Sequence, residues 1–414
     1  MNVKKDKKKR RTKRLAFLAV IIIFISSFFG SFTLDGFVPN TTYAVSESEE
    51  VEELEQQIEE EIGSQLGDLD FSAIETYLEN LTDDVQNAFS GGFVTKVESL
   101  INGEYTSSEN FFTSLMSLLW DGLLSFLPII ASIIAISILG GMVGNLKPST
   151  NGKSIGNIVH FVTYGVVIVF LGTTLVEMIA LTTKTLTNLK STMDAIFPIL
   201  LTLLTAVGGT VSVSLYQPAI AMLGNVFISL ITYFLLPLFI FSIIFSIVGN
   251  LSNNVKLDKF VAFLQGTFKW SIGLIFTLFL GFMTIQGISA GAVDGLSIRT
   301  AKYTIKSYVP IVGGYVSDGL SIIMASSMLI KNAVGTAGLL LVLFMAISPV
   351  INLILFMLSL KFMAGIIEPI GDKKVANFVS DISKSMSMLV ALIVAVSFMY
   401  MVMTGLIMCS ANLI

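Results

Sequence analysis

Long apolar runs separated by short polar segments dominate the chain from residue 123 onward. A helix that crosses a bilayer needs about 20 consecutive apolar residues. Runs near that length lie at 123–143, 158–180, 196–216, 219–248, 268–290, 320–347, 349–367 and 386–409. The third run contains Gly208 and Gly209, and Pro218 follows it, so the third and fourth runs could instead form a broken or re-entrant hairpin. The pattern predicts an all-α fold, a polytopic helical membrane bundle of seven or eight spans.

The segment before these runs, 45–121, has a different pattern. Apolar residues recur every three or four positions across 51–66 and again across 71–89, on an acidic background, which is typical of amphipathic helices. Ser72 and Glu75 have the spacing of a capping box at the start of the second helix. Two interpretations stay open: the helices pack on one another as a small cap, or their apolar stripe docks a partner.

The N-terminus carries the pattern of an export signal. Nine lysines and arginines between Lys4 and Arg14 precede an apolar stretch that begins at Leu15. Small residues follow, and Ala44 offers an acceptable cleavage site, although an uncleaved anchor would show the same pattern. We expect residues 1–44 to be a signal peptide. This basic run is therefore interpreted as part of an export signal, and no nucleic-acid partner is expected.

Composition supports a membrane protein and three regions. Hydrophobic residues make up 54% of the 414 residues, charged residues only 13%, and the mean hydropathy is +0.82, which excludes an ordinary soluble protein. Most of the 29 acidic residues lie between Glu47 and Asp121, where Lys96 is the only base. We predict a signal peptide at 1–44, an acidic extracytoplasmic helical segment at 45–121 and a polytopic transmembrane domain at 122–414, which contacts the lipid bilayer.

Basic residues between the runs predict an orientation, because cytoplasmic loops are enriched in lysine and arginine. With the acidic segment exported, the C-terminus is expected outside. Two of the loops expected outside contain lysines, contrary to this rule: one holds Lys184 and Lys190, and the other holds Lys256 and Lys259. The basic residues expected inside are Lys147, Lys153, Arg299, Lys302, Lys306, Lys373, Lys374 and Lys384.

Neither a catalytic nor a metal-binding pattern is found in the sequence. It contains no glycine-rich phosphate loop, no zinc-protease motif and no nucleophile elbow. His160 has no ligand-type neighbour at metal-binding spacing and is expected to be a polar residue near a helix end, while Cys409 is the only cysteine. We therefore expect no enzyme, no metal and no cofactor.

Ionisable residues inside apolar runs are costly and are candidates for function. Glu177 and Lys361 lie near the ends of predicted spans and can extend toward water, so a structural role is favoured for both. Lys331 lies deep in its run and needs a partner. Asp318 is on the wrong side of the same helix, so we expect a polar cluster of Lys331 with Glu368 from a different span.

Small residues and a weak repeat complete the pattern. Glycines at four-residue spacing, such as Gly140 and Gly144, allow close helix packing. The segments 190–199 and 302–311 both have a basic residue followed eight positions later by Pro-Ile. If they are inverted repeats, a binding site could lie at their junction, as in secondary transporters.

Longer stretches resemble a known family. They read SIRTAKYTIKSYVPIVGGYVSDGLSIIMASSMLIK at 297–331, then NAVGTAGLLL, KFMAGIIEPIGDKKV and DISKSMSMLV, with a looser match, AIFPILLTLLTAVGGTVS, at 195–212. With the signal peptide, the acidic segment and the apolar runs, these stretches resemble the stage III sporulation protein AE family of endospore-forming Firmicutes. The residues that match the family pattern are Pro310, Gly313, Gly314, Asp318, Lys331, Asn332, Gly335, Glu368 and Asp372.

The resemblance implies a permease-like subunit of the mother-cell-to-forespore channel complex, a feeding or secretion complex that supports forespore development after engulfment. It implies the outer forespore membrane as location, and as partners other stage III sporulation proteins of the mother cell and a forespore membrane protein across the intermembrane space. A structural scaffold and an autonomous transporter are the alternatives. Candidate conduit or gate residues are Lys331, Asp318, Glu368, Asn332, Lys361 and Glu177. Candidate helix-break or packing residues are Pro310, Gly313, Gly314, Gly335, Gly208 and Gly209.

Overall fold

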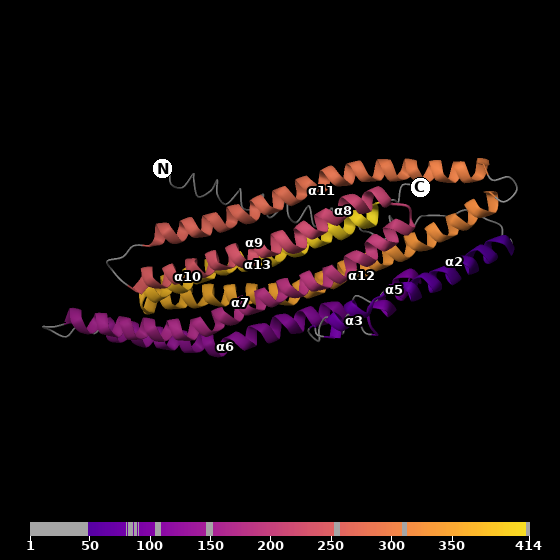
Figure 1. Ribbon diagram of the computed structural model, residues 1–414. Helices are drawn as coiled ribbons and strands as arrows, with labels where there is room; N and C mark the ends of the chain where they lie inside the picture. The colour runs from indigo at the N-terminus through magenta and orange to yellow at the C-terminus, as the bar shows by residue number, and fades with distance from the viewer. Residues whose placement is uncertain are drawn as a thin grey trace, which may run out of the picture. The chain divides into compact units, whose positions relative to one another are not determined.

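The computed structural model describes residues 49–79, 81, 86, 89, 91–103, 109–145, 152–251, 257–308 and 313–410, so the predicted signal peptide at 1–44 lies outside it. Residues 1–56 and 57–414 form separate compact units, and the packing below concerns the second unit. The α-helices are α2 (Glu49–Asp68), α3 (Ser72–Glu79), α5 (Phe93–Ile101), α6 (Glu109–Asn145), α7 (Gly152–Ala206), α8 (Thr210–Ala221), α9 (Ile228–Leu230), α10 (Leu236–Leu251), α11 (Asp258–Tyr308), α12 (Gly313–Ile370) and α13 (Lys373–Cys409). Two π-helical turns, η2 (Met222–Phe227) and η3 (Ile231–Leu235), join α8, α9 and α10 into one continuous rod (Figure 1).

The all-helical membrane bundle predicted from the sequence is confirmed. In the described part of the chain, six helical segments are long and apolar enough to cross a membrane, namely Met116–Val143, Ile158–Ala206, Thr210–Leu251, Asp258–Gln286, Gly319–Ile370 and Lys373–Cys409. This is fewer than the seven or eight spans expected, because several of the predicted runs belong to single continuous helices.

The continuity of α7 removes one predicted loop. Lys184 and Lys190 were expected in an outer loop, but they lie within the helix. The hydroxyls of Thr182, Thr183 and Thr185 each donate to the carbonyl four residues earlier, so these polar side chains bond within the helix instead of ending it. The runs 320–347 and 349–367 likewise form the single helix α12, which continues through Pro349.

The centre of the bundle is formed by α12 and α13, which lie side by side (Figure 1). Both present fully buried side chains along their length, including Val342, Leu353 and Leu360 of α12 and Leu389 and Met403 of α13. Helices α6, α7, α10 and α11 pack around this pair. Packing of this kind outweighs the cost of about 3 kcal/mol that a proline imposes inside a helix, which explains why Pro349 does not end α12.

Three pairs of helix ends lie at one end of the bundle, called here the turn end: the end of α6 with the start of α7, the end of α10 with the start of α11, and the end of α12 with the start of α13. Gly141 lies against the backbone of Gly371, and the Tyr164 hydroxyl donates to the Ile247 carbonyl at 2.8 Å. The turn end therefore includes Lys259, near the start of α11, although the loop of Lys256 and Lys259 was expected on the opposite side from Lys373.

Arg299 also lies on the opposite side from the one predicted. It lies 40 positions after Lys259 on α11, about 60 Å away at 1.5 Å per residue. Arg299 is therefore far from the turn end, whereas the sequence placed it on the same side as Lys373. The error follows from the miscounted spans, because each span added or removed reverses the side of every later loop.

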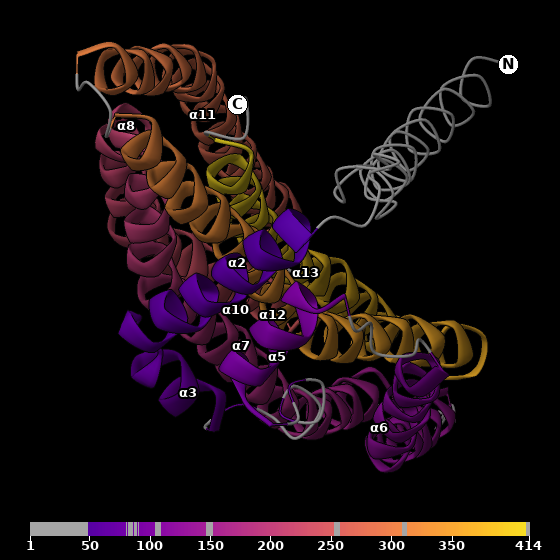
Figure 2. The ribbon, with the colours of Figure 1, turned by 90° about the vertical axis from the view of Figure 1, so that its right-hand side faces the viewer.

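The acidic segment packs on the bundle with residues 57–103, called here the head. Phe71, Phe89 and Phe93 are buried and their rings contact one another, and Phe89 meets Phe344 of α12 edge to face at 6.3 Å. Figure 2 shows α3 and α5 lying over α7 and α12. The second apolar run, at 71–89, therefore has a partner within the protein. The predicted boundary at 121/122 falls inside α6.

Two carboxylates organise the head. At the start of α3, the Asp70 carboxylate accepts the Ser72 amide at 3.0 Å and also the Ser72 hydroxyl, while the Glu75 amide donates to the Phe71 carbonyl and not to the Ser72 hydroxyl. Glu75 was predicted to complete a capping box with Ser72, but its carboxylate accepts the amides of Phe93 and Val94 at 2.7 and 3.0 Å. Glu75 therefore caps α5, a helix 18 residues later, and joins the two short helices.

Candidate functional site

The turn between α7 and α8 is the helix break that the sequence predicted at Gly208 and Gly209. The Gly209 amide donates to the Leu204 carbonyl and the Gly208 amide to the Thr205 carbonyl, both at 2.8 Å, which is a Schellman motif. Gly208 has a φ of 93°, a conformation that glycine adopts without steric cost. The chain reverses here, far from the turn end.

Asp294 of α11 caps the helix that follows this break. Its carboxylate oxygens accept the amides of Val211 and Ser212 at 3.0 Å each, and the residue is fully buried. A carboxylate suits this place because amides at a helix start lack partners within the helix and carry partial positive charge. The sequence pattern does not single out Asp294, because this residue lies between two predicted spans and its partners are 82 and 83 positions away.

Lys331 of α12 is fully buried, and its side chain reaches the C-terminal end of α13. Its ammonium donates to the Ser410 carbonyl at 2.5 Å. The Ser410 hydroxyl is 2.8 Å from the Tyr216 hydroxyl and also donates to the Leu406 carbonyl. A cation at a helix C-terminus interacts favourably with the last carbonyls. Lys331, Ser410 and Tyr216 therefore join α12, α13 and α8, and we call these three residues the lysine cluster.

Two neighbours of Lys331 on α12, Gly335 and Asn332, lie in closely packed surroundings. A Cβ atom on Gly335 would lie 2.4 Å from the side chain of Met408, so glycine lets α12 and α13 approach closely beside the lysine cluster. The side-chain oxygen of Asn332 is buried and accepts no hydrogen bond from the residues that the structure describes.

The expected cluster of Lys331 with Glu368 does not form. Both residues lie on the single continuous helix α12, about 55 Å apart at 1.5 Å per residue, because no break separates the two predicted spans. Glu368, Lys361 and Glu177 are all exposed. Asp318, Gly313 and Gly314 lie in the first turns of α12, and Pro310 falls outside the described residues.

His160 has a carboxylate partner that the sequence did not reveal. Its Nδ1 contacts Asp372, which is 212 positions away and whose other oxygen accepts the Lys374 amide at 2.8 Å as the N-cap of α13. This contact holds the start of α7 against the turn between α12 and α13. Within the described ranges, no three histidine, cysteine or acidic side chains gather in a way that could hold a metal ion.

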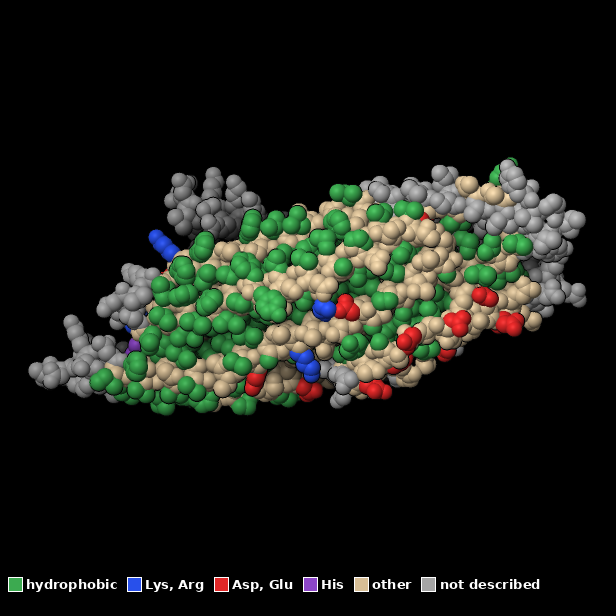
Figure 3. All heavy atoms as spheres, in the orientation of Figure 1, with side chains coloured by type: hydrophobic (Ala, Val, Ile, Leu, Met, Phe, Trp, Pro, Cys, Tyr) green, Lys and Arg blue, Asp and Glu red, His purple; other side chains and the backbone are tan. Residues whose placement is uncertain are grey.

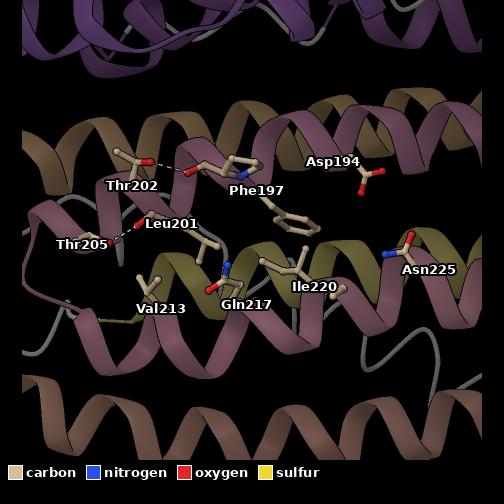
Figure 4. Close-up of a pocket in the computed structure, with 11 residues that line it drawn as sticks. Asp194, Phe197, Leu201, Thr202, Thr205, Val213, Gln217, Ile220 and Asn225 are labelled. Carbon is tan, nitrogen blue, oxygen red and sulfur yellow. Dashed lines mark hydrogen bonds between the residues drawn. The ribbon is translucent and has the colours of Figure 1, made fainter.

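An open groove of about 480 Å³ runs between α7 and α8 (Figure 4). Asp194 and Asn225 lie toward one end, Thr202 and Thr205 toward the other, and Phe197 lies between them. Both threonine hydroxyls are already used, since they donate to carbonyls of their own helix at 2.9 Å. Asp194 forms an ion pair with Lys190.

Comparison with known proteins identifies the family. The family model described as "Stage III sporulation protein AE" matches residues 93–411. This chain belongs to the stage III sporulation protein AE family. A curated protein of that name from Bacillus subtilis (strain 168) is 27% identical over 314 residues, which cover 76% of this chain and 79% of the relative. No solved structure matches the chain.

The family match covers the helical bundle but not the first helices of the head. It begins at Phe93, the first residue of α5, and includes the whole bundle from α6 to α13. The stage III sporulation protein AE model therefore covers Asp294, the lysine cluster and the groove. Helices α2 and α3, which hold much of the acidic charge, lie before the matched region.

Proposed function

We propose that this chain is a membrane subunit of the mother-cell-to-forespore channel complex, a feeding or secretion complex that supports forespore development after engulfment. The observation that carries the proposal is the family match across the entire helical bundle. In this proposal the chain lies in the outer forespore membrane. Its partners are other stage III sporulation proteins of the mother cell and a forespore membrane protein across the intermembrane space.

The buried charges favour a structural role for this subunit within the complex. Asp294 accepts two backbone amides at the start of α8, and Lys331 donates to the last turn of α13. Each charge thus satisfies a helix terminus, which is sufficient reason for a charged residue in a packed bundle. The candidate conduit residues Glu368, Lys361 and Glu177 are exposed and spread over two helices, so they do not outline a path through the chain.

The proposal is tested by gene replacement in Bacillus subtilis. The relative's gene is deleted, this chain is expressed in its place, and heat-resistant spores and a late forespore-specific reporter are counted. We expect this chain to restore both and to copurify with stage III sporulation proteins. A chain that reaches the membrane at normal level but restores neither, together with normal sporulation when its own gene is deleted in the native host, would contradict the proposed function.

A second comparison separates a scaffold from a conduit. Lys331→Met and the exposed control Lys361→Met are expressed at matched level in the native host, and spore yield is measured with the membrane content of the protein. A scaffold predicts that spores are lost only in proportion to the protein lost. Loss of spores with normal protein level and normal copurification would favour a conduit through Lys331. Ion-coupled uptake by the purified chain alone would instead favour an autonomous transporter.

A further inference from the structure

Exposed side chains change character along the rod formed by α8, α9 and α10. In α8 the exposed positions include Thr210, Ser214 and Gln217. From Met222 onward they include many large apolar residues. The exposed large apolar residues of this part are Met222, Val226, Leu230, Tyr233, Phe234, Ile240, Phe241, Ile244, Val248 and Leu251. A water-exposed helix surface thus changes to a surface suited to lipid near Met222.

Two other long helices show the same change in the same direction. On α7 the large apolar side chains exposed after Ile158 end at Val176, and the exposed positions that follow include Lys184, Thr187, Asp194, Thr202 and Thr205. On α11 exposed apolar residues extend from Phe260 to Ile285, and Arg299, Thr300 and Thr304 are exposed beyond them. In all three cases the apolar part adjoins the turn end.

The lengths of the apolar segments agree with one bilayer. Met116–Val143 and Asp258–Gln286 have 28 and 29 residues, which is about 42 Å of helix and matches the roughly 40–45 Å of a bilayer with its headgroups. Three other segments have 49, 42 and 52 residues, more than one crossing requires. On the face drawn in Figure 3, apolar side chains gather on the half with the turn end, and most of the acidic side chains lie from the middle of the molecule toward the opposite end.

We propose that lipid surrounds only the half of the bundle next to the turn end, with the turn end in the cytoplasm, and that the same helices project from the bilayer on the other side. The charges agree with this orientation, because Lys259, Lys373 and Lys374 lie at the turn end and the acidic head packs on the projecting half through Gln65 and Ser327. The lipid belt is formed by α6, the first half of α7, the rod from Met222 to Leu251, α11 up to residue 286 and α12 from residue 342 onward. The helices that the structure describes cross the bilayer six times, and the C-terminal end of α13 is extracytoplasmic.

Both halves contain exceptions of the kind expected at such surfaces. Lys269 and Lys361 are exposed within the lipid belt, and their long side chains can extend toward the nearer headgroups. Tyr303, Ile323 and Leu329 are exposed in the projecting half, but exposed apolar residues that are scattered singly are normal on protein surfaces in water.

This placement changes the surroundings of the polar sites. The turn at Gly208, the Asp294 cap and the lysine cluster all belong to the projecting half, and so does most of the groove. Lys331 then lies beyond the lipid, about 16 Å farther along α12 than residue 342, where a crossing of 29 residues that ends at Ile370 would begin. Burial by protein, and not by lipid, is what excludes water from it.

The test uses full-length protein in lipid nanodiscs, with Cys409→Ser as the background. Single cysteines replace Thr202 and Ser214 in the projecting half and Val169 and Ile244 in the lipid belt, and each carries a nitroxide spin label. We expect labels at 202 and 214 to be relaxed mainly by a water-soluble nickel complex and labels at 169 and 244 mainly by oxygen, which concentrates in lipid. Lipid-type accessibility at both 202 and 214, as eight spans would require, would overturn the proposal.

An independent measurement needs no substitution. Hydroxyl radicals generated in water modify exposed tyrosines, and Tyr233 and Tyr303 are 81% and 72% exposed in the protein alone. In nanodiscs we expect Tyr303 to be modified and Tyr233 to be protected, whereas equal modification would refute the lipid belt. For the orientation, a membrane-impermeant thiol reagent added to intact cells should label Ser214→Cys, and Lys373→Cys only after lysis; the reverse result would invert the proposed topology.

Discussion

At the scale of single residues, buried charge in this protein acts at the ends of helices. Asp294 and Lys331 lie on different helices, yet each compensates backbone groups that have no partner within their own helix. The sequence singled out Lys331 because a lysine is conspicuous in an apolar run, but it named the wrong partner. Asp294 could not be identified from the sequence, because only folding brings its carboxylate to the amides at the start of α8.

Replacing Lys331 should destabilise the protein measurably. Lys331→Met removes the donor to the Ser410 carbonyl, and an unsatisfied buried carbonyl costs about 1–3 kcal/mol. We expect a lower thermal midpoint in nanodiscs than for Lys361→Met, the control on the exposed surface of the same helix. An unchanged midpoint for Lys331→Met would show that the hydrogen bond contributes nothing net to the fold.

Asp70 provides a pH dependence confined to the head. Hydrogen bonds from the Ser72 hydroxyl and amide hold the pKa of the Asp70 carboxyl below its ordinary value. A carboxyl whose pKa is lower in the folded state stabilises the fold above its unfolded pKa of about 3.9, and this contribution is lost as the pH falls through the folded pKa.

We therefore expect the protection of amides at the start of α3, which is the exchange rate relative to the intrinsic rate at the same pH, to fall below about pH 4. Asp70→Asn should show fast exchange already at neutral pH and little further change on acidification. Asp68→Asn, which removes a nearby charge, is the control. A wild-type exchange profile in Asp70→Asn would exclude the carboxylate as the cause.

At the scale of helices, local sequence predicted breaks better than it predicted continuity. The Gly208–Gly209 break was predictable because adjacent glycines favour the conformation that a Schellman turn requires. The continuity of α7 through Lys184 and of α12 through Pro349 was not, because neighbouring helices hold these segments in register. Apolar runs alone therefore overestimated the number of spans.

Gly208→Ala should be among the most damaging of the small substitutions. The added Cβ would require a φ of 93° and would lie 2.8 Å from Ile298, so we expect a loss of more than about 1 kcal/mol. Gly172→Ala is the matched control, since its Cβ meets nothing within 4 Å and alanine favours a helix. Thermal unfolding of both variants in nanodiscs checks the difference, and equal midpoints would contradict the strain argument.

At the scale of the whole molecule, the head is part of the bundle's packing. The buried ring of Phe89 contacts Phe93 within the head and Phe344 of α12. The sequence predicted the amphipathic helices of this segment but left open whether they would pack internally or on a partner, because a periodic stripe does not specify what covers it. The structure shows that α3 packs on α7 and that Phe89 packs on Phe344 of α12, so the second run of the stripe, at 71–89, is covered by the bundle.

Phe89→Ala should detach the head from the bundle. Removing a buried phenylalanine costs about 3–5 kcal/mol, more than a small docked segment can absorb. We expect limited proteolysis in nanodiscs to cut between residues 80 and 108 in this variant while the bundle stays intact. Tyr77→Ala, at a side chain 41% exposed, serves as the control. Equal protection of both variants would show that other contacts hold the head.

The central place of α13 also has a consequence for biosynthesis. A ribosome makes α13 after the other helices of the bundle, yet α13 occupies the middle of the bundle beside α12. The helices made earlier must therefore enter the membrane with their core-facing sides uncovered until α13 has been made. A nascent or truncated chain without residues 373–409 would therefore lack the centre of its own core and would leave apolar surface exposed that the complete bundle buries.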